Sequence, residues 1–350
     1  MKKIAWIDTI RIMAALMVIF AHYFMCAGFK DSSPYLHHAL SYDVAIIGVA
    51  IFLAMSGYLI PASLKRAPSL GKFYVRKFIR IVAPFTMSYL ALTAALAPVA
   101  LFSEEIFNLL PIFNLLRGGD FSAIILGMFP VDFNAAVFFG VTVYIFVGEW
   151  FMATILWLYL LAPLLNYFAV RRPLISLAAS IVVSCAAFYA TQGVIFDPWA
   201  LFVVRVPEFL FGMILFLHRE RLKKFQPQLV IGSSIFLAAN LIYFVATFKL
   251  ETGMFFSASP ASFALTLPAI YLLFTFAEML DKFRLKIFER LNSLCADSYV
   301  AMIIQHVIIQ LFALAIAFET LDEFGRFVVL LLIIVTTFAA ARIINKFSFK

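Results

Sequence analysis

The sequence predicts an all-α, polytopic membrane protein with about ten transmembrane helices. Of the 350 residues, 65% are hydrophobic and only 13% are charged, whereas soluble domains carry about 25% charged residues. Apolar runs close to the roughly 20 residues that a helix needs to cross a bilayer recur along the whole chain. These runs are continuous rather than alternating, and a helix satisfies its own backbone hydrogen bonds in lipid, so helices are expected throughout.

The apolar runs define ten predicted spans, which together form one transmembrane domain over residues 1–350 with no separate soluble domain. They cover residues 7–29, 43–64, 79–102, 149–169, 174–193, 199–218, 228–248, 259–279, 293–316 and 326–346. The longest connection, 103–148, holds apolar stretches broken by Pro130, Asp132 and Gly140. One further crossing there would place the basic segments that follow on the outer side, whereas lysine and arginine are usually in excess on the inner side. We therefore expect a re-entrant or lid-like region on the outer side.

The distribution of lysine and arginine predicts that both termini lie in the cytoplasm. Cytoplasmic loops of membrane proteins carry an excess of these residues, and this orientation places most of the 27 on the inner side. The exceptions would be Lys30, Arg117, Lys249 and Arg326 in outer segments, and Arg11 and Arg205 within spans. The net charge of +8 follows from this topology, so it does not indicate nucleic-acid binding.

The three cysteines indicate neither a disulfide framework nor a metal site. Cys26, Cys185 and Cys295 are scattered, and they lie mostly within predicted spans. No metal and no permanently bound cofactor is expected. Since no soluble domain of appreciable size is predicted, any chemistry must take place in or beside the membrane.

The first predicted span carries two ionisable side chains, Arg11 and His22. Eleven helical steps of about 100° return almost to the starting direction, so both side chains lie on one face, roughly 16 Å apart along the axis. Ionisable residues within membrane spans are costly and usually functional. The pair therefore predicts a site that binds an anion at the inner end and performs proton chemistry deeper in the membrane. Structural roles are also open: Arg11 could extend to the inner interface or pair with Asp8, and His22 could bond a neighbouring helix.

The other candidate polar residues form two predicted groups. Arg76, Lys77 and Arg80 lie on the inner side, where they could bind phosphate or only set the topology. Glu149, Arg205, Glu208 and His306 would lie toward the outer side, although Arg205 and Glu208 could simply neutralise each other. Ser56–Gly57 more plainly indicates a close contact between helices, because small residues let two backbones approach.

Several segments, in order, resemble the integral-membrane acyltransferase-3 family. "IDTIRIMAALMVIFAHYF" resembles its first span, with an arginine, ten residues and a histidine, and "IFLAMSGYLI" is similar to its second-span motif. "KFYVRKFIRIVAPF" resembles the basic inner segment of the family, and "GEWFMATILWLYLLAPLL" its fourth span, with Glu149 near a frequent glutamate. "VVRVPEFLFGMIL" and "SLCADSYVAMIIQHVII" are similar to later elements, the last ending near His306. Lys77 departs from the family by replacing one member of an arginine pair.

The resemblance implies a bacterial inner-membrane enzyme that moves an acyl group, usually acetyl from acetyl-CoA, to a hydroxyl of an envelope carbohydrate or glycolipid. The expected catalytic residues are His22, as general base, with Arg11 and Glu149. Donor binding is expected at Arg11, Arg76, Lys77 and Arg80. Acceptor binding is expected at Arg205, Glu208 and His306.

Two other functions agree with the same residues. A secondary transporter or flippase for a polar or glycolipid substrate could use His22, Glu208 and His306 as a proton relay. It would move its substrate without changing it chemically. A non-catalytic scaffold would tolerate the loss of Arg11 and His22.

Overall fold

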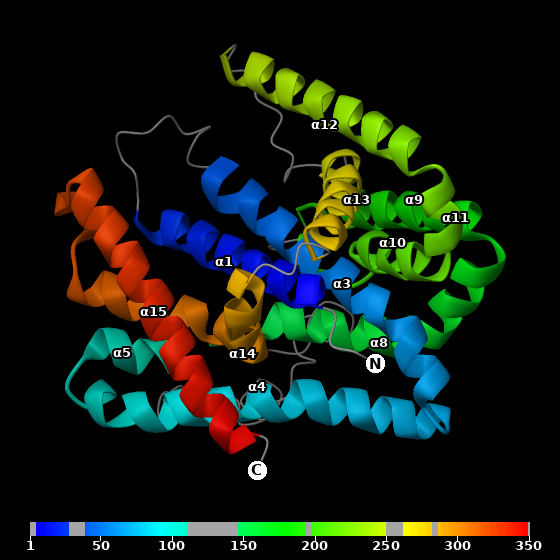
Figure 1. Cartoon of the computed structure of the whole chain (residues 1–350). Helices are drawn as coiled ribbons and strands as arrows, with labels where there is room; N and C mark the ends of the chain where they lie inside the picture. The colour runs from blue at the N-terminus through cyan, green and yellow to red at the C-terminus, as the bar shows by residue number, and fades with distance from the viewer. Residues whose placement is uncertain are drawn as a thin grey trace. The chain divides into compact units, whose positions relative to one another are not determined.

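A computed structural model describes residues 5–27, 39–110, 146–193, 198–249, 262–281 and 286–348, and these residues are helical apart from short turns, with no strand among them. The α-helices are α1 (Ala5–Ala27), α3 (Val44–Arg66), α4 (Leu70–Ala100), α5 (Glu104–Leu109), α8 (Glu149–Arg171), α9 (Pro173–Thr191), α10 (Val206–Leu217), α11 (Arg219–Lys224), α12 (Gln226–Lys249), α13 (Ser262–Asp281), α14 (Lys286–Ala315) and α15 (Glu323–Ser348) (Figure 1). A π-helical turn, η1 (Ala39–Asp43), and two 3-10 turns, η3 (Pro198–Ala200) and η5 (Phe318–Thr320), complete the described elements. The all-α prediction is confirmed.

Eight of the described helices are long and apolar enough to cross a membrane. They are α1, α3, α4, α8, α9, α13, α14 and α15. The predicted span at 228–248 corresponds to α12, a helix of 24 residues. The predicted span at 199–218 is not one continuous helix, because a 3-10 turn and irregular backbone precede the 12-residue α10. The number of crossings and the side of each terminus stay predictions.

The basic segment before the third predicted span is helical rather than a loop. α4 begins at Leu70 because the Ser69 side chain caps it, accepting a hydrogen bond from the Lys72 backbone amide at 3.2 Å. The helix has 31 residues and is therefore roughly 46 Å long, more than the hydrocarbon thickness of a bilayer. Arg76 and Arg80 are exposed on its early turns.

Most of the predicted outer-side region 103–148 lies outside the described residues. Its beginning forms the short helix α5, capped by Ser103, whose side chain accepts a hydrogen bond from the Ile106 amide at 3.4 Å. A hydrogen bond from its own backbone amide, and then one from the Ser103 hydroxyl, hold the pKa of Glu105 below its usual value. The lid or re-entrant segment itself stays a prediction.

The chain divides into two units, each assembled from segments that are distant in sequence. The first contains residues 1–67, 161–199 and 203–295, and the second contains residues 68–160, 200–202 and 296–350. The division falls within α8 after Leu160 and within α14 after Cys295. The prediction of a single transmembrane domain over 1–350 is not decided by this division.

In the first unit α3 packs against both α1 and α10, and the contacts depend on small residues (Figure 1). At Gly48 an added Cβ would lie 3.0 Å from Val18 Cγ2 and 3.1 Å from the Ala14 carbonyl oxygen. At Gly57 it would overlap the Phe209 carbonyl, and at Gly212 the Ala54 carbonyl. The prediction that Ser56–Gly57 marks a close helix contact is confirmed, and α10 supplies the facing glycine.

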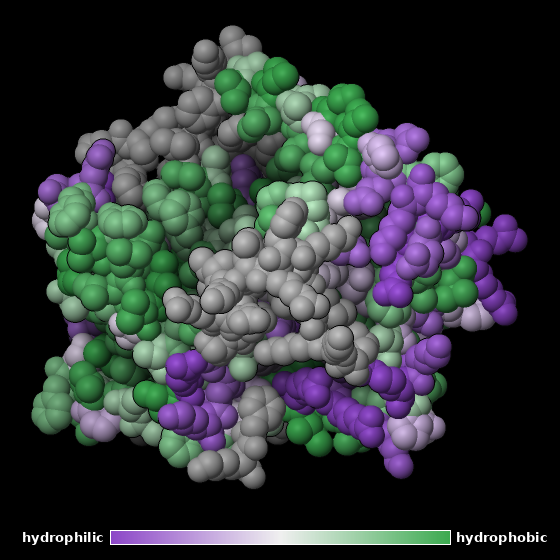
Figure 2. All heavy atoms as spheres, viewed as in Figure 1, coloured by the Kyte–Doolittle hydropathy of each residue, from purple (hydrophilic) through white to green (hydrophobic). Residues whose placement is uncertain are grey.

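In the second unit α4 and α15 are in contact, and polar bonds connect α14 with its neighbours. The Tyr299 hydroxyl donates to the Ile81 carbonyl at 3.0 Å, and the Gly148 amide donates to the Ile303 carbonyl at 3.1 Å. Asp297 accepts from Arg342 at 3.2 Å and from Asn345 at 2.9 Å. Hydrophobic side chains are visible over the upper part of α15 (Figure 2), as expected for a helix that faces lipid.

Replacing Gly57 by alanine is expected to destabilise the protein by about 1–3 kcal/mol, because the added methyl group meets backbone that cannot move independently. Gly212→Ala should have a similar effect. Gly232→Ala on α12 is the matched control, since nothing lies within 4 Å of its added Cβ. Thermal unfolding of the detergent-solubilised variants measures the difference. Equal midpoints for Gly57→Ala and Gly232→Ala would contradict the close contact between α3 and α10.

Candidate functional site

Arg11 and His22 both lie on α1, which is continuous over their eleven-residue separation. The close contact of α3 at Gly48 reaches Ala14 and Val18, which lie between them along the helix. This contact fixes the rotation of α1, and with it the direction of both side chains. The helical spacing confirms that Arg11 and His22 share one side of α1, roughly 16 Å apart along the axis.

Arg11 is bound to two polar groups at the start of α1. Its Nη1 donates to Cys295 Sγ at 3.2 Å and lies 3.9 Å from Asp8 Oδ1. The Cys295 thiol in turn donates to Asp8 Oδ1 at 3.0 Å. The Arg11 side chain still exposes 28% of its surface, while Asp8 exposes 11%. The carboxylate and the thiol thus hold the guanidinium in place and leave part of it accessible.

His22 is half-buried, and its Nδ1 lies 2.9 Å from the Val18 carbonyl oxygen, one turn back on the same helix. A carbonyl oxygen only accepts hydrogen bonds, so this contact places the ring proton on Nδ1. In that tautomer the basic lone pair is on Nε2. This arrangement suits a general base, because the hydrogen bond to Val18 also orients the ring.

Arg205 and Glu208 lie together where irregular backbone meets the start of α10. Arg205 Nη1 is 3.1 Å from Glu208 Oε1, and both side chains are 1% exposed. Arg205 Nε donates to the Trp199 carbonyl at 2.9 Å, and the guanidinium lies 4.8 Å from the centre of the Trp199 ring. Arg205 therefore binds both the irregular backbone before α10 and the first-turn carboxylate of α10. Irregular backbone at membrane depth is tolerated only in such buried or solvated surroundings.

The remaining predicted site residues lie in the second unit. Lys77 Nζ lies 4.8 Å from the centre of the Tyr159 ring, a cation–π contact, whereas Arg76 and Arg80 are exposed. His306 Nε2 lies 3.0 Å from Gln310 Nε2 on the same helix. Glu149 is the first residue of α8, and its side chain lies outside the described part. The expected donor and acceptor roles of all these residues stay predictions.

Cys295 was not among the residues predicted to contact Arg11. The two residues are 284 positions apart, and no local pattern distinguishes this cysteine from Cys26 or Cys185. Asp8 was detectable, since it lies three residues before Arg11 on the same helix. The break before α10 also had a local signal, because Pro198 and Pro207 both disfavour a continuous helix.

The fold and these residues define a class: an integral, multi-pass helical membrane protein with ionisable side chains inside its spans. A comparison with protein families then identifies the chain, because the model described as "Acyltransferase domain" matches residues 4–346. The chain belongs to the acyltransferase-3 family and is therefore a membrane acyltransferase. No curated protein and no solved structure gives a significant match.

Replacing Arg205 by methionine is expected to destabilise the protein by about 3–5 kcal/mol, because it leaves the buried Glu208 carboxylate without its cation. The double variant Arg205→Met/Glu208→Met should recover most of this loss, since no buried charge then remains. Lys346→Met, at an exposed position on α15, is the control and should stay within about 0.5 kcal/mol. Thermal unfolding in detergent measures all three. A stable but inactive Arg205→Met would instead indicate that the pair binds substrate.

Proposed function

We propose that the protein is an O-acyltransferase of the bacterial inner membrane. It moves an acetyl group from acetyl-CoA to a hydroxyl of an envelope carbohydrate or glycolipid. The observation that supports this most directly is the arrangement on α1, where Arg11 is fixed by Asp8 and Cys295 and His22 follows about three turns later. One helix thus carries an anion-binding group and a base.

In the proposed reaction His22 Nε2 takes the proton of the acceptor hydroxyl. The oxygen then attacks the carbonyl carbon of the thioester and forms the new C–O bond. The C–S bond breaks, and the coenzyme A thiolate leaves with the proton that the imidazolium returns. The products are an acetyl ester and free coenzyme A, so no net proton is gained or lost.

Arg11 binds an anionic group of the donor in this proposal, and Arg76, Lys77 and Arg80 contact the coenzyme A phosphates. Support comes from the partial exposure of Arg11 and from the exposure of Arg76 and Arg80 on the early turns of α4. Glu149, Arg205, Glu208 and His306 are proposed to position the acceptor. The almost complete burial of Arg205 and Glu208 favours an indirect effect through the backbone before α10.

A transporter using His22, Glu208 and His306 as a proton relay is the second candidate. One observation bears on it: Glu208 is engaged by Arg205 at 3.1 Å and buried. A relay carboxylate has to exchange its proton with water or a neighbouring group, and the Glu208 side chain is 1% exposed and held by Arg205. The pairing therefore favours the acyltransferase.

The His22→Ala variant is expected to lose nearly all acyl transfer, since positioned general bases contribute about 10²–10⁴-fold. Membranes that contain wild type or variant are incubated with labelled acetyl-CoA, and both thioester loss and label in an extracted glycan fraction are measured. Arg11→Ala should mainly raise the apparent KM for acetyl-CoA. Lys72→Gln removes an exposed cation from α4 and should leave activity unchanged. Full activity of His22→Ala would exclude it as the base.

Asp8 and Cys295 are expected to act as positioning residues for Arg11. Asp8→Asn and Cys295→Ala should each raise the apparent KM for acetyl-CoA about three- to tenfold with little change in kcat, a loss typical of one hydrogen bond. Cys295→Ser keeps a hydroxyl donor and should rescue most of the effect. Cys185→Ala is the matched cysteine control. If kcat falls and KM stays constant in these variants, Asp8, Cys295 and Arg11 do not act through donor binding.

A further inference from the structure

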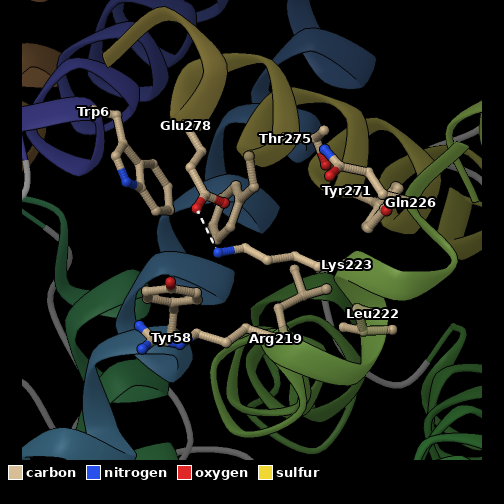
Figure 3. A pocket seen from close by; sticks show the side chains of 11 residues that line it. Trp6, Tyr58, Arg219, Leu222, Lys223, Gln226, Tyr271, Thr275 and Glu278 are labelled. Carbon is tan, nitrogen blue, oxygen red and sulfur yellow. Dashed lines mark ion pairs between the residues drawn. The ribbon is translucent and has the colours of Figure 1, made fainter. Parts of the chain in front are cut away.

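A small pocket with a mixed polar and apolar lining lies in the first unit at the short helix α11, and neither Arg11 nor His22 lines it. Its accessible volume is about 50 Å³. Aromatic and charged side chains from four helices line it, among them Trp6 of α1, Tyr58 of α3, Arg219 and Lys223 of α11, and Glu278 of α13 (Figure 3). Trp6 and Tyr58 pack edge to face, with ring centres 5.5 Å apart, and form an apolar wall.

Two cations of the pocket lie one helical turn apart on α11. Lys223 Nζ pairs with Glu278 Oε1 at 3.3 Å, and Arg219 Nε pairs with Glu220 Oε1 at 3.1 Å. The Arg219 guanidinium lies beside Tyr58 in Figure 3. All four of these charged side chains are about half-exposed or more. Ion pairs of this kind are weak, so a stronger anion can displace the carboxylates.

A larger cavity of about 780 Å³ adjoins this pocket between α12 and α13. The two share four lining residues, Lys223, Gln226, Thr275 and Glu278. The other walls of the larger cavity are apolar, formed by Val230, Leu272, Phe276 and Met279. The Lys223–Glu278 pair thus lies at one end of a mostly apolar groove, within the size range of small-molecule sites, roughly 300–1,000 Å³.

The surroundings of α11 are strongly basic. Arg221 and Lys224 are exposed next to Arg219 and Lys223, and Figure 2 shows hydrophilic side chains gathered over this helix. The distribution of lysine and arginine predicts that α11 lies on the cytoplasmic side. The cytoplasmic leaflet carries anionic lipids, and basic pockets between transmembrane helices on that side bind phosphorylated headgroups.

We propose that this site binds an anionic phospholipid. The headgroup phosphate lies between Arg219 and Lys223, where it displaces Glu278, and an acyl chain follows the apolar groove between α12 and α13. A phosphate matches the two cations, and a chain matches the apolar walls. A soluble phosphate ester such as coenzyme A shares only the first of these features. The proposal does not depend on the acyl-transfer chemistry, because it uses none of the residues assigned to it.

The test compares Arg219→Gln/Lys223→Gln with the matched control Arg221→Gln/Lys224→Gln, which removes the same charge from the same helix outside both cavities. Phosphatidylglycerol, phosphatidylcholine with the same chains, glycerol 3-phosphate and coenzyme A are titrated into purified protein in detergent. Native mass spectrometry measures lipid retention, and thermal unfolding measures stabilisation. Wild type should retain phosphatidylglycerol in preference to phosphatidylcholine. The pocket variant should bind phosphatidylglycerol roughly 30-fold more weakly, and the control should match wild type.

Two results would overturn the proposal. Equal losses in both double variants would show only general attraction to a basic helix. Competition by coenzyme A or glycerol 3-phosphate at the concentration of the lipid would identify a soluble phosphate site instead. Glu278→Gln adds an independent check, since it removes one of the two carboxylates that pair with Arg219 and Lys223, at a half-exposed position. It should tighten phosphatidylglycerol binding several-fold, and weaker binding would contradict the assigned headgroup position.

Discussion

The first unit depends on giving two arginines in apolar surroundings, Arg11 and Arg205, polar partners. Arg11 has Asp8 and Cys295, and Arg205 has Glu208 and the Trp199 carbonyl. In lipid these cations are costly without such partners. The two arginines differ in accessibility, because the Arg11 side chain is 28% exposed whereas the Arg205 side chain is 1% exposed. Arg11 is therefore suited to bind a ligand, while Arg205 stabilises the backbone before α10.

Close packing of α3 connects the surroundings of Arg11 on α1 with those of Arg205 before α10. At one end Gly48 contacts α1 between Arg11 and His22, and at Gly57 the helix meets α10 just after Glu208. Small residues on α3 and α10 allow this approach, which larger side chains would prevent. Helix α3 consequently sets both the rotation of α1 and the position of the α10 start. The same helix contributes Tyr58 to the small pocket beside α11.

Hydropathy and charge were sufficient to predict the all-α class and the place of nearly every long helix. Helix ends were less predictable: α4 begins at Leu70 because Ser69 caps it, although the apolar run starts later. The break before α10 was missed because apolar composition continued through it. Arg11 and His22 were predicted as site residues from their spacing within one helix. Cys295 could not be found, since its contact with Arg11 arises from packing between segments 284 residues apart.

Release of free coenzyme A by purified protein in detergent micelles tests whether this membrane protein carries out the proposed acyl transfer. Micelles have no compartments, so no gradient can form and transport cannot be measured. We expect acetyl-CoA cleavage that rises with added carbohydrate acceptor and is absent from His22→Ala. Cleavage no greater than in His22→Ala across a range of acceptors, together with substrate movement in vesicles, would contradict it and favour the transporter.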